Sequence, residues 1–359
     1  MNNIFVSDCE GPISKNDNAF ELAQNFIPNG DQLFANISKY DDVMADVLEK
    51  PGYSAGGTLR LILPFFKAYC ISDPEMEAFS EQNIVLIANS RITLQHVQEI
   101  SDTFIVSTSY EHYIKALCKV VDFPFKNTYC TRVTLDKIPI TRQEKDRLRT
   151  LAQEIIQMRL LSIPQGAKTI KDFCNRDIAT IQRLDEIFWS EIPRMSLGKF
   201  LNVVTVGGEQ KAESIRDAAK RLDVGLANVI YVGDSITDVQ ALRLVRENGG
   251  LSVSFNGNFY AVKNAEVAVQ SESNLVMAVI ADLFYRLGKE QTLNVLDFWS
   301  IETLEQSDVK EALLEQFFKV YRDCLPKVQI VTPENMETIT KESTAFRKKV
   351  RGVSIGRLG

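Results

Sequence analysis

The sequence predicts an α/β protein built on an open, mostly parallel β-sheet, and three observations support this fold class. Short apolar runs recur along the chain, separated by amphipathic helical patterns. These runs do not alternate with polar residues, which is typical of parallel strands buried on both faces. Several of them end on acidic or hydroxyl side chains, at the edge where open parallel sheets bind their ligands. We therefore expect a Rossmann-like core.

Six apolar runs are expected to be strands. They cover residues 4–8, 103–109, 200–206, 228–235, 251–255 and 265–269. Between them, stretches such as "EQKAESIRDAAKRL" and "ITDVQALRLVREN" place apolar residues at helical spacing. Apolar runs that alternate with amphipathic helices in this way favour parallel strands buried on both faces. After residue 290 the strand signals nearly cease, and helical patterns dominate.

Two long helical segments interrupt this alternation and divide the chain. The predicted core comprises residues 1–18, 83–135 and 196–290; a helical cap covers 19–82, a second helical insertion 136–195, and a helical C-terminal extension 291–359. The sequence does not decide whether the second insertion is an additional lid or a surface for a partner. The chain closes on the basic stretch "FRKKVRGVSIGRLG", for which we predict loose order.

Composition excludes several classes of function. The chain has 359 residues, of which 45% are hydrophobic and 25% charged, as in ordinary globular proteins. The net charge of -6 leaves no general attraction for nucleic acid. The apolar runs are too short to span a membrane, and the first residues lack a signal-peptide pattern. The six cysteines are scattered, without the close spacing of a zinc or redox site, so we expect a reduced, cytoplasmic protein without membrane insertion.

Acidic side chains follow two of the predicted strands. Asp8 and Glu10 follow the first strand, and Asp234 and Asp238 follow "VIYVG". If these strand ends are neighbours, the carboxylates converge, and without a cation each would raise the pKa of the others. Hard oxygen ligands with few histidines nearby favour Mg²⁺. The sequence therefore predicts a magnesium site at this edge of the sheet.

The same strand ends carry groups suited to phosphoryl transfer. A carboxylate can attack phosphorus and form an aspartyl phosphate when a metal neutralises the incoming dianion. Ser107 and Thr108 follow "FIV", and Lys211 lies at the start of a helix, whose N-terminus also favours anions. Lys199 or Lys220 could take the place of Lys211, and Ser107 is also a natural cap for the following helix. Arg60 and Arg91 are further candidate substrate anchors.

The motifs "DCEGP", "IVSTSY", "GGEQKAESI" and "VIYVGDSITDVQAL" resemble, in order and character, the four signature motifs of the haloacid dehalogenase (HAD) superfamily. The stretch "SFNGNFYAVKNAEVAV" resembles its phosphoserine-phosphatase-like members. Most members of the superfamily are magnesium-dependent phosphohydrolases, and many carry a helical cap after the first motif. The resemblance covers the core strands, roughly half of the chain.

By position, this resemblance implies a role for each site residue. Asp8 would be the nucleophile, and Glu10 the acid/base that protonates the leaving oxygen and later activates water. The implied magnesium site is formed by Asp8, Glu10 through its carbonyl, Asp234 and Asp238. The implied phosphate site is formed by Ser107, Thr108 and Lys211. We accordingly expect a magnesium-dependent phosphomonoester hydrolase that acts on a small phosphorylated metabolite through an aspartyl phosphate.

The first motif departs from the family pattern twice. Its second acid is usually aspartate, and Glu10 is one methylene longer; Pro12 stands where a small β-branched residue is usual. These departures motivate an alternative: a catalytically weak relative that acts as a subunit or regulatory partner in a larger assembly, through its insertions or C-terminal tail. A phosphotransferase or mutase is a third reading. The stretch "SDCEGPISKNDNAFELA" also resembles an archaeal branch labelled energy-converting hydrogenase A subunit R, which implies association with a hydrogenase.

Overall fold

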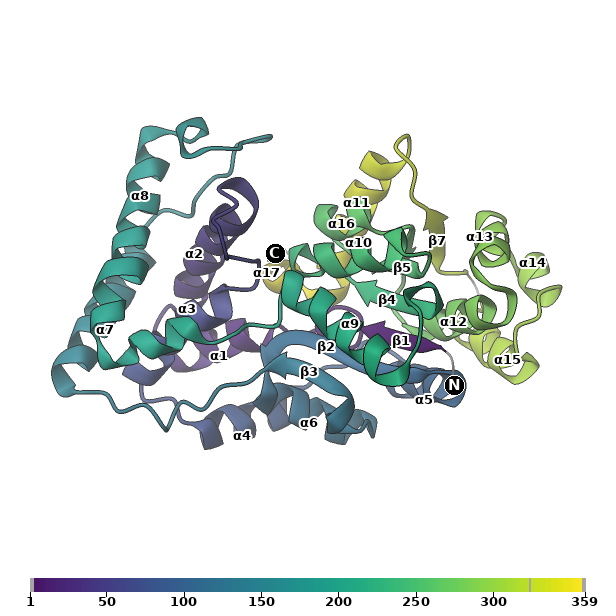
Figure 1. Ribbon diagram of the computed structural model, residues 1–359, viewed down its shortest axis with the longest axis horizontal. Helices are drawn as coiled ribbons and strands as arrows, with labels where there is room; N and C mark the ends of the chain where they lie inside the picture. Colours follow the sequence, from purple (N-terminus) through teal and green to yellow (C-terminus); the bar gives the residue numbers. More distant parts are fainter. Residues whose placement is uncertain (1–2, 323, 357–359) are drawn as a thin grey trace.

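The computed structural model describes residues 3–322 and 324–356 of the chain. Within these residues, seven strands form one sheet in the order β3-β2-β1-β4-β5-β6-β7 (Figure 1). All neighbouring strands are parallel except β6 and β7. The strands are β1 (Ile4–Ser7), β2 (Asp102–Tyr110), β3 (Thr128–Thr131), β4 (Val229–Gly233), β5 (Leu251–Phe255), β6 (Val267–Gln270) and β7 (Lys327–Ile330). The predicted α/β fold class is confirmed.

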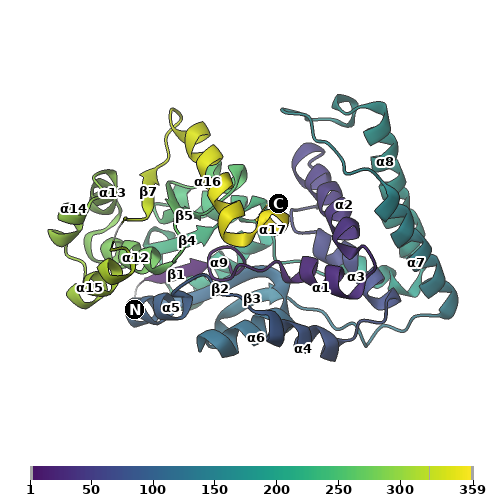
Figure 2. The ribbon, with the colours of Figure 1, turned by 180° about the vertical axis from the view of Figure 1, so that it is seen from behind.

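Helices cover both faces of the sheet (Figures 1 and 2). In β1, Phe5 faces a core that includes Val97 and Ile280, whereas Ile4 faces one that includes Ile215. Burial on both faces explains why the strand sequences are apolar throughout. The first face is covered by α5 (Ser90–Ile100) and α12 (Leu275–Leu287), the second by α9 (Glu209–Leu222) and α10 (Val239–Glu247); α6 (Glu111–Val121) packs beside β2 and β3.

The central strand β1 places two chemically important loops next to each other. Ser7, its last residue, is in register with Ile105 of β2 and Val232 of β4. The ladder continues one step further, because the Asp8 N–H donates to the Val232 carbonyl at 2.8 Å. The loops that follow β1 and β4 therefore start side by side at the carboxyl edge of the sheet, next to the last part of β2, which continues to Tyr110.

Five of the six predicted strands are present, and the prediction for residues 200–206 is wrong. There a 3-10 helix (Ser196–Asn202) is followed by extended chain outside the sheet, in which Val204 is 65% exposed. Phe200 and Leu201 are buried instead in the hydrophobic core formed by the helices of the two insertions. Strands β3 and β7 were not predicted. Both are short, and β7 lies at an edge of the sheet, so neither is a long apolar run.

The two insertions pack together as one helical unit. Leu33 and Phe65 of the first share a hydrophobic core with Leu151 and Phe188 of the second, and the Asn36 amide donates to the Ile155 carbonyl at 2.8 Å. Figure 1 shows these helices standing beside the sheet. The unit contains α1 (Asn18–Phe26), α2 (Gly30–Asp42), α3 (Thr58–Ala68), α7 (Arg142–Gln157) and α8 (Asn175–Glu186), whereas α4 (Asp73–Asn83) contacts α6 of the core. The second insertion thus extends the first.

The C-terminal extension returns to the carboxyl edge of the sheet. After α13 (Lys289–Asp297), α14 (Ile301–Glu305), α15 (Glu311–Val320) and β7, the chain forms α16 (Met336–Arg351) and α17 (Val353–Gly356). Ile339 is fully buried, and the Ser343 hydroxyl donates to the Gly257 carbonyl at 2.7 Å. The prediction of a loosely ordered end is therefore wrong as far as residue 356, and residues 357–359 lie outside the described chain. Among the described helices, none is long and apolar enough to cross a membrane.

Candidate active site

The loop after β1 is a compact turn that requires glycine. The N–H groups of Ile13 and Ser14 both donate to the Cys9 carbonyl at 2.9 Å. Gly11 has a φ of +114°, and a Cβ on this residue would lie 2.0 Å from an oxygen of Asp234. Only a residue without a side chain allows this close approach. The first motif is thereby held directly against the carboxylate that follows β4.

Lys211 forms a buried ion-pair cluster with two of the predicted site acids. Its ammonium lies 2.8 Å from Asp8 and 2.7 Å from Asp238, and the lysine is fully buried. Burial acts to lower the pKa of Lys211, but the two carboxylates outweigh it and hold that pKa above its usual value. Burial raises the pKa of Asp8 to about 7, although Lys211 opposes the shift. Burial acts to raise the pKa of Asp238, but Lys211 and the hydrogen bonds from Tyr231 and the Asp234 N–H together outweigh burial and lower that pKa.

Asp238 is a structural acceptor with both oxygens engaged. One oxygen accepts from Lys211 and from the Tyr231 hydroxyl at 2.6 Å. The other accepts from the backbone N–H groups of Asp234 and Ser235, each at 2.9 Å. Asp238 therefore organises the loop after β4 and holds Lys211 in place.

The arrangement of carboxylates fits a hard divalent cation. Oxygens of Asp8, Asp234 and Asp238 lie within 4.8 Å of one another, and all three residues are buried. Oxygen donors of this kind match the preferences of Mg²⁺. Asp8, Asp234 and Asp238 together form a candidate site for a divalent cation.

Glu10 points toward the start of the helical unit. One of its carboxylate oxygens accepts from the Asn18 N–H at 2.7 Å, at the beginning of α1. Burial, and then the neighbouring Asp17, raise the pKa of Glu10 well above its usual range. Glu10 thus connects the first motif to the start of α1. Asp17 itself caps α1 by accepting from the Phe20 N–H at 3.0 Å.

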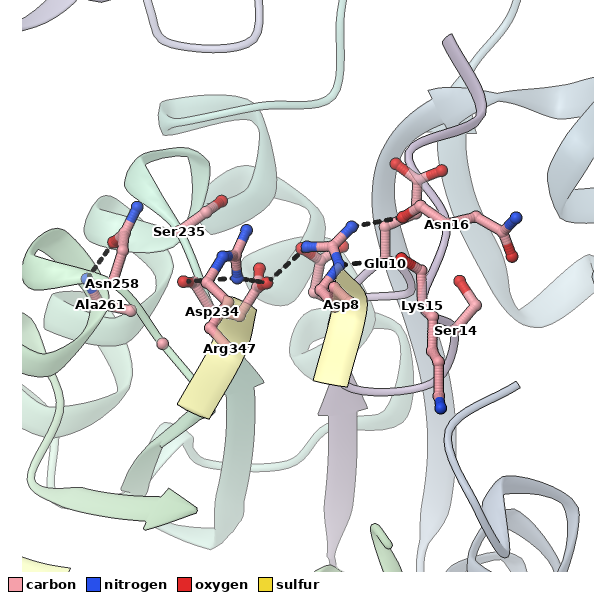
Figure 3. A network of polar contacts seen from close by, with 12 residues as sticks. Asp8, Glu10, Ser14, Lys15, Asn16, Asp234, Ser235, Asn258, Ala261 and Arg347 are labelled. Atoms are coloured by element: carbon pink, nitrogen blue, oxygen red, sulfur yellow. Dashed lines mark hydrogen bonds and ion pairs between the residues drawn. The ribbon is translucent and has the colours of Figure 1, made fainter. Parts of the chain in front are cut away.

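Two arginines from α16 enter the site, and sequence reasoning missed both. Arg347 and Arg351 both form ion pairs with the same carboxylate oxygen of Asp234. The Arg351 pair has an N–O distance of 3.0 Å. The two arginine side chains are 3% and 5% exposed. Figure 3 shows Arg347 beside Asp234, with Asp8 on the neighbouring strand end. The available signal was their spacing of four residues, which places both on one face of a helix.

These groups surround a pocket of about 100 Å³. Ser107 and Thr108 line it as expected, together with Asp8 and Asp234, whereas Lys211 lies beneath and does not line it. The helical unit closes the opposite side, for example with Phe34. The other candidate cations lie elsewhere: Lys199 and Lys220 are exposed, Arg60 stacks on Tyr53, and Arg91 pairs with Asp122.

Comparisons with known proteins identify the family. The family model of haloacid dehalogenase-like hydrolases matches residues 80–282, more than half of the chain. This range contains the strand-end motifs after β2 and β4 and the Lys211 helix, and it starts after Asp8. A search among curated proteins finds no match.

One solved structure shares this fold over the whole chain. The structure of gene product AF1437 from Archaeoglobus fulgidus superposes with a TM-score of 0.80 at 24% identity, covering 100% of this chain and 99% of the other. Phosphoserine phosphatase in its apo form gives a TM-score of 0.46 at 10% identity, covering 76% of this chain and 96% of the other. The suggested link to a hydrogenase stays a prediction. With its family match, sheet order and strand-end motifs, the chain belongs to the haloacid dehalogenase-like hydrolases.

Proposed function

We propose that the protein is a magnesium-dependent phosphomonoester hydrolase, which transfers a phosphoryl group from a small metabolite to Asp8 and then to water. The observation that supports this most strongly is the meeting of Asp8 and Asp234 at adjacent strand ends, within one pocket that Ser107 and Thr108 also line. A nucleophilic carboxylate, a second metal-binding carboxylate and hydroxyl donors are the groups that the reaction needs.

In this proposal Asp8 attacks phosphorus, and the bond between phosphorus and the leaving oxygen breaks. Hydrogen bonds from Lys211 and from the Cys9 N–H, at 2.8 and 2.7 Å, fix the orientation of the Asp8 carboxylate. Ser107 and Thr108 would donate to the phosphoryl oxygens. A bound Mg²⁺, held by Asp8, Asp234 and the Glu10 carbonyl, would neutralise the negative charge on those oxygens.

Glu10 would act first as the general acid and then as the general base. Burial favours its protonated form, which gives a proton to the leaving oxygen. The resulting carboxylate then takes a proton from water, which attacks the phosphorus of the acyl phosphate, releases inorganic phosphate and restores Asp8. The hydrogen bond from the Asn18 N–H holds one Glu10 oxygen in place at the pocket.

The size of the pocket supports a small substrate. Its volume of about 100 Å³ leaves little room beyond a phosphoryl group and a few further atoms. Phe34, Ser38 and Leu59 of the helical unit form the wall that would meet the leaving group. A cap in this position would exclude water while the acyl phosphate forms, and would set the choice of substrate.

The test is turnover of an aryl phosphate with Mg²⁺ by the Asp8→Asn variant. Loss of the nucleophile should reduce kcat by at least about 1000-fold. Asp31→Asn, which alters an exposed acid of α2, is the matched control and should keep normal turnover. Activity of Asp8→Asn close to that of the unaltered protein would reject the assignment.

A second measurement separates a working phosphatase from a catalytically silent relative. Beryllium fluoride with Mg²⁺ mimics a phosphorylated aspartate, so it should raise the melting temperature of the unaltered protein by mass action. It should leave the melting temperature of Asp8→Asn unchanged. No stabilisation in the unaltered protein would favour the regulatory-subunit alternative. Transfer of phosphate to added alcohols would indicate a phosphotransferase instead.

A further inference from the structure

The pocket is rich in negative charge for a site that would receive a phosphate. Among the described residues that line it, six are acids: Asp8, Glu10, Asp17, Asp41, Asp42 and Asp234. The positive charges that line it come from Arg347 and Arg351, both in the C-terminal extension. Lys211, the cation that the sequence suggested for phosphate binding, lies beneath the pocket with its ammonium between Asp8 and Asp238. Among the described residues that line the pocket, the cations that can meet an anionic substrate therefore come from α16.

The two arginines differ in how fully their donors are used. Arg351 is committed to the protein: its Nε donates to the Lys15 carbonyl at 3.0 Å, and its two Nη groups reach the Asn16 carbonyl and Asp234. It ties α16 to the loop before α1. Arg347 bonds Asp234 through one Nη group, while its buried Nε has no hydrogen-bond partner among the described residues. A buried guanidinium donor without a partner is uncommon in a native structure.

The packing of α16 against the core holds Arg347 in a fixed position. Four residues earlier on α16, the Ser343 hydroxyl is anchored on the Gly257 carbonyl, and another four residues earlier Ile339 is fully buried. One face of the helix is thereby fixed to the core, and this face carries Arg347 to the pocket. Figure 3 shows its guanidinium next to Asp234 and close to the Asp8 strand end.

We propose that Arg347 is an anion-binding residue of the active site, which donates to oxygens of the substrate phosphoryl group, so that the C-terminal extension completes the phosphate site. A guanidinium offers paired N–H donors that match two oxygens of a phosphoryl group. The identity of the anion rests on the proposed function; the anion site itself does not.

The experiment measures binding of tungstate, a tetrahedral oxyanion, to the full chain by calorimetry without metal. The unaltered protein should bind tungstate, and Arg347→Gln should weaken binding about 10- to 100-fold, as expected for loss of a hydrogen bond to a charged group. Arg347→Lys keeps the positive charge but lacks the paired N–H donors, so its tungstate affinity should lie between those of the unaltered protein and Arg347→Gln. Lys341→Gln removes an exposed charge from the same helix and should bind like the unaltered protein.

Two results would overturn the proposal: no tungstate binding by the unaltered protein, or Arg347→Gln binding within twofold of it. If Arg347→Gln does not fold, the ¹⁵Nε resonance of Arg347 in the unaltered protein decides. A shift on titration with tungstate supports the assignment, and an unchanged resonance rejects it. Because no turnover is involved, this outcome is independent of whether Asp8 is the nucleophile, which the Asp8→Asn assay tests separately.

Discussion

Replacing Lys211 with methionine should destabilise the protein by about 3 kcal/mol, because it removes the cation from a buried cluster while keeping the volume of the side chain. Removing one partner of a buried ion pair costs about 3–5 kcal/mol. The lower end applies here. Asp8 already has a pKa of about 7 and can take up a proton, and Asp238 keeps its bonds from Tyr231 and from two backbone N–H groups.

The assay is urea unfolding at neutral pH without metal, followed by circular dichroism. Lys220→Met is the matched control, since Lys220 lies exposed on the same helix α9, and it should change the unfolding free energy by less than about 0.5 kcal/mol. Adding Asp238→Asn to Lys211→Met should recover part of the loss, because the remaining buried charge is removed. Equal stability of Lys211→Met and Lys220→Met would refute the reasoning that the cluster depends on its cation.

Two further substitutions test the loop after β1 and the helical unit. Gly11→Ala should lower the free energy of unfolding by about 3 kcal/mol and abolish turnover, because the new Cβ would meet Asp234. The control Gly52→Ala, also at positive φ but in open space, should lower the free energy of unfolding by only about 1 kcal/mol. Equal losses of melting temperature in the two variants would contradict this explanation. Burial acts to raise the pKa of Glu144. Hydrogen bonds, first from the Ser196 N–H, outweigh burial and lower this pKa to about 2. Glu144→Gln should therefore destabilise by up to about 1 kcal/mol at neutral pH, and the difference should shrink as pH falls from the usual Glu range toward 2, whereas a pH-independent loss would argue against this role.

The core strands could be predicted because of where they lie. β1 contributes Phe5 to one face and Ile4 and Val6 to the other, so its sequence is apolar without alternation. The acids after β1 and β4 could be placed together for the same reason, since neighbouring parallel strands end at one edge. The strands and the convergence of Asp8 with Asp234 were therefore accessible from local patterns.

The error at residues 200–206 has a physical origin in the apolar residues themselves. Burial in a sheet and burial among helices require the same apolar side chains. The run "FLNVVTV" therefore predicts a strand, although Phe200 packs in the hydrophobic core of the helical unit. β3 was not predicted because it lacks a long apolar run. It is an edge strand of four residues, and Tyr129 within it turns to Asp217 on α9, to which it donates at 2.5 Å.

The arginines of α16 could not have been assigned from the sequence. Their partner Asp234 lies more than 100 residues earlier, and nothing local distinguishes a basic helix that enters a pocket from a solvated tail. The helix is positioned by long-range contacts, such as the bond from Ser343 to Gly257, which only the folded chain reveals. The spacing of Arg347 and Arg351 gives a shared face but no destination.

The most direct test of the account is chemical trapping of the acyl phosphate. The enzyme would be mixed with a labelled phosphomonoester and Mg²⁺, quenched in acid, reduced with borohydride, digested and mapped by mass spectrometry. Reduction of an aspartyl phosphate yields homoserine, and we predict homoserine at position 8 with transient label in the unreduced sample. Label on a different residue, or sustained turnover with aspartate unchanged at position 8, would contradict the account.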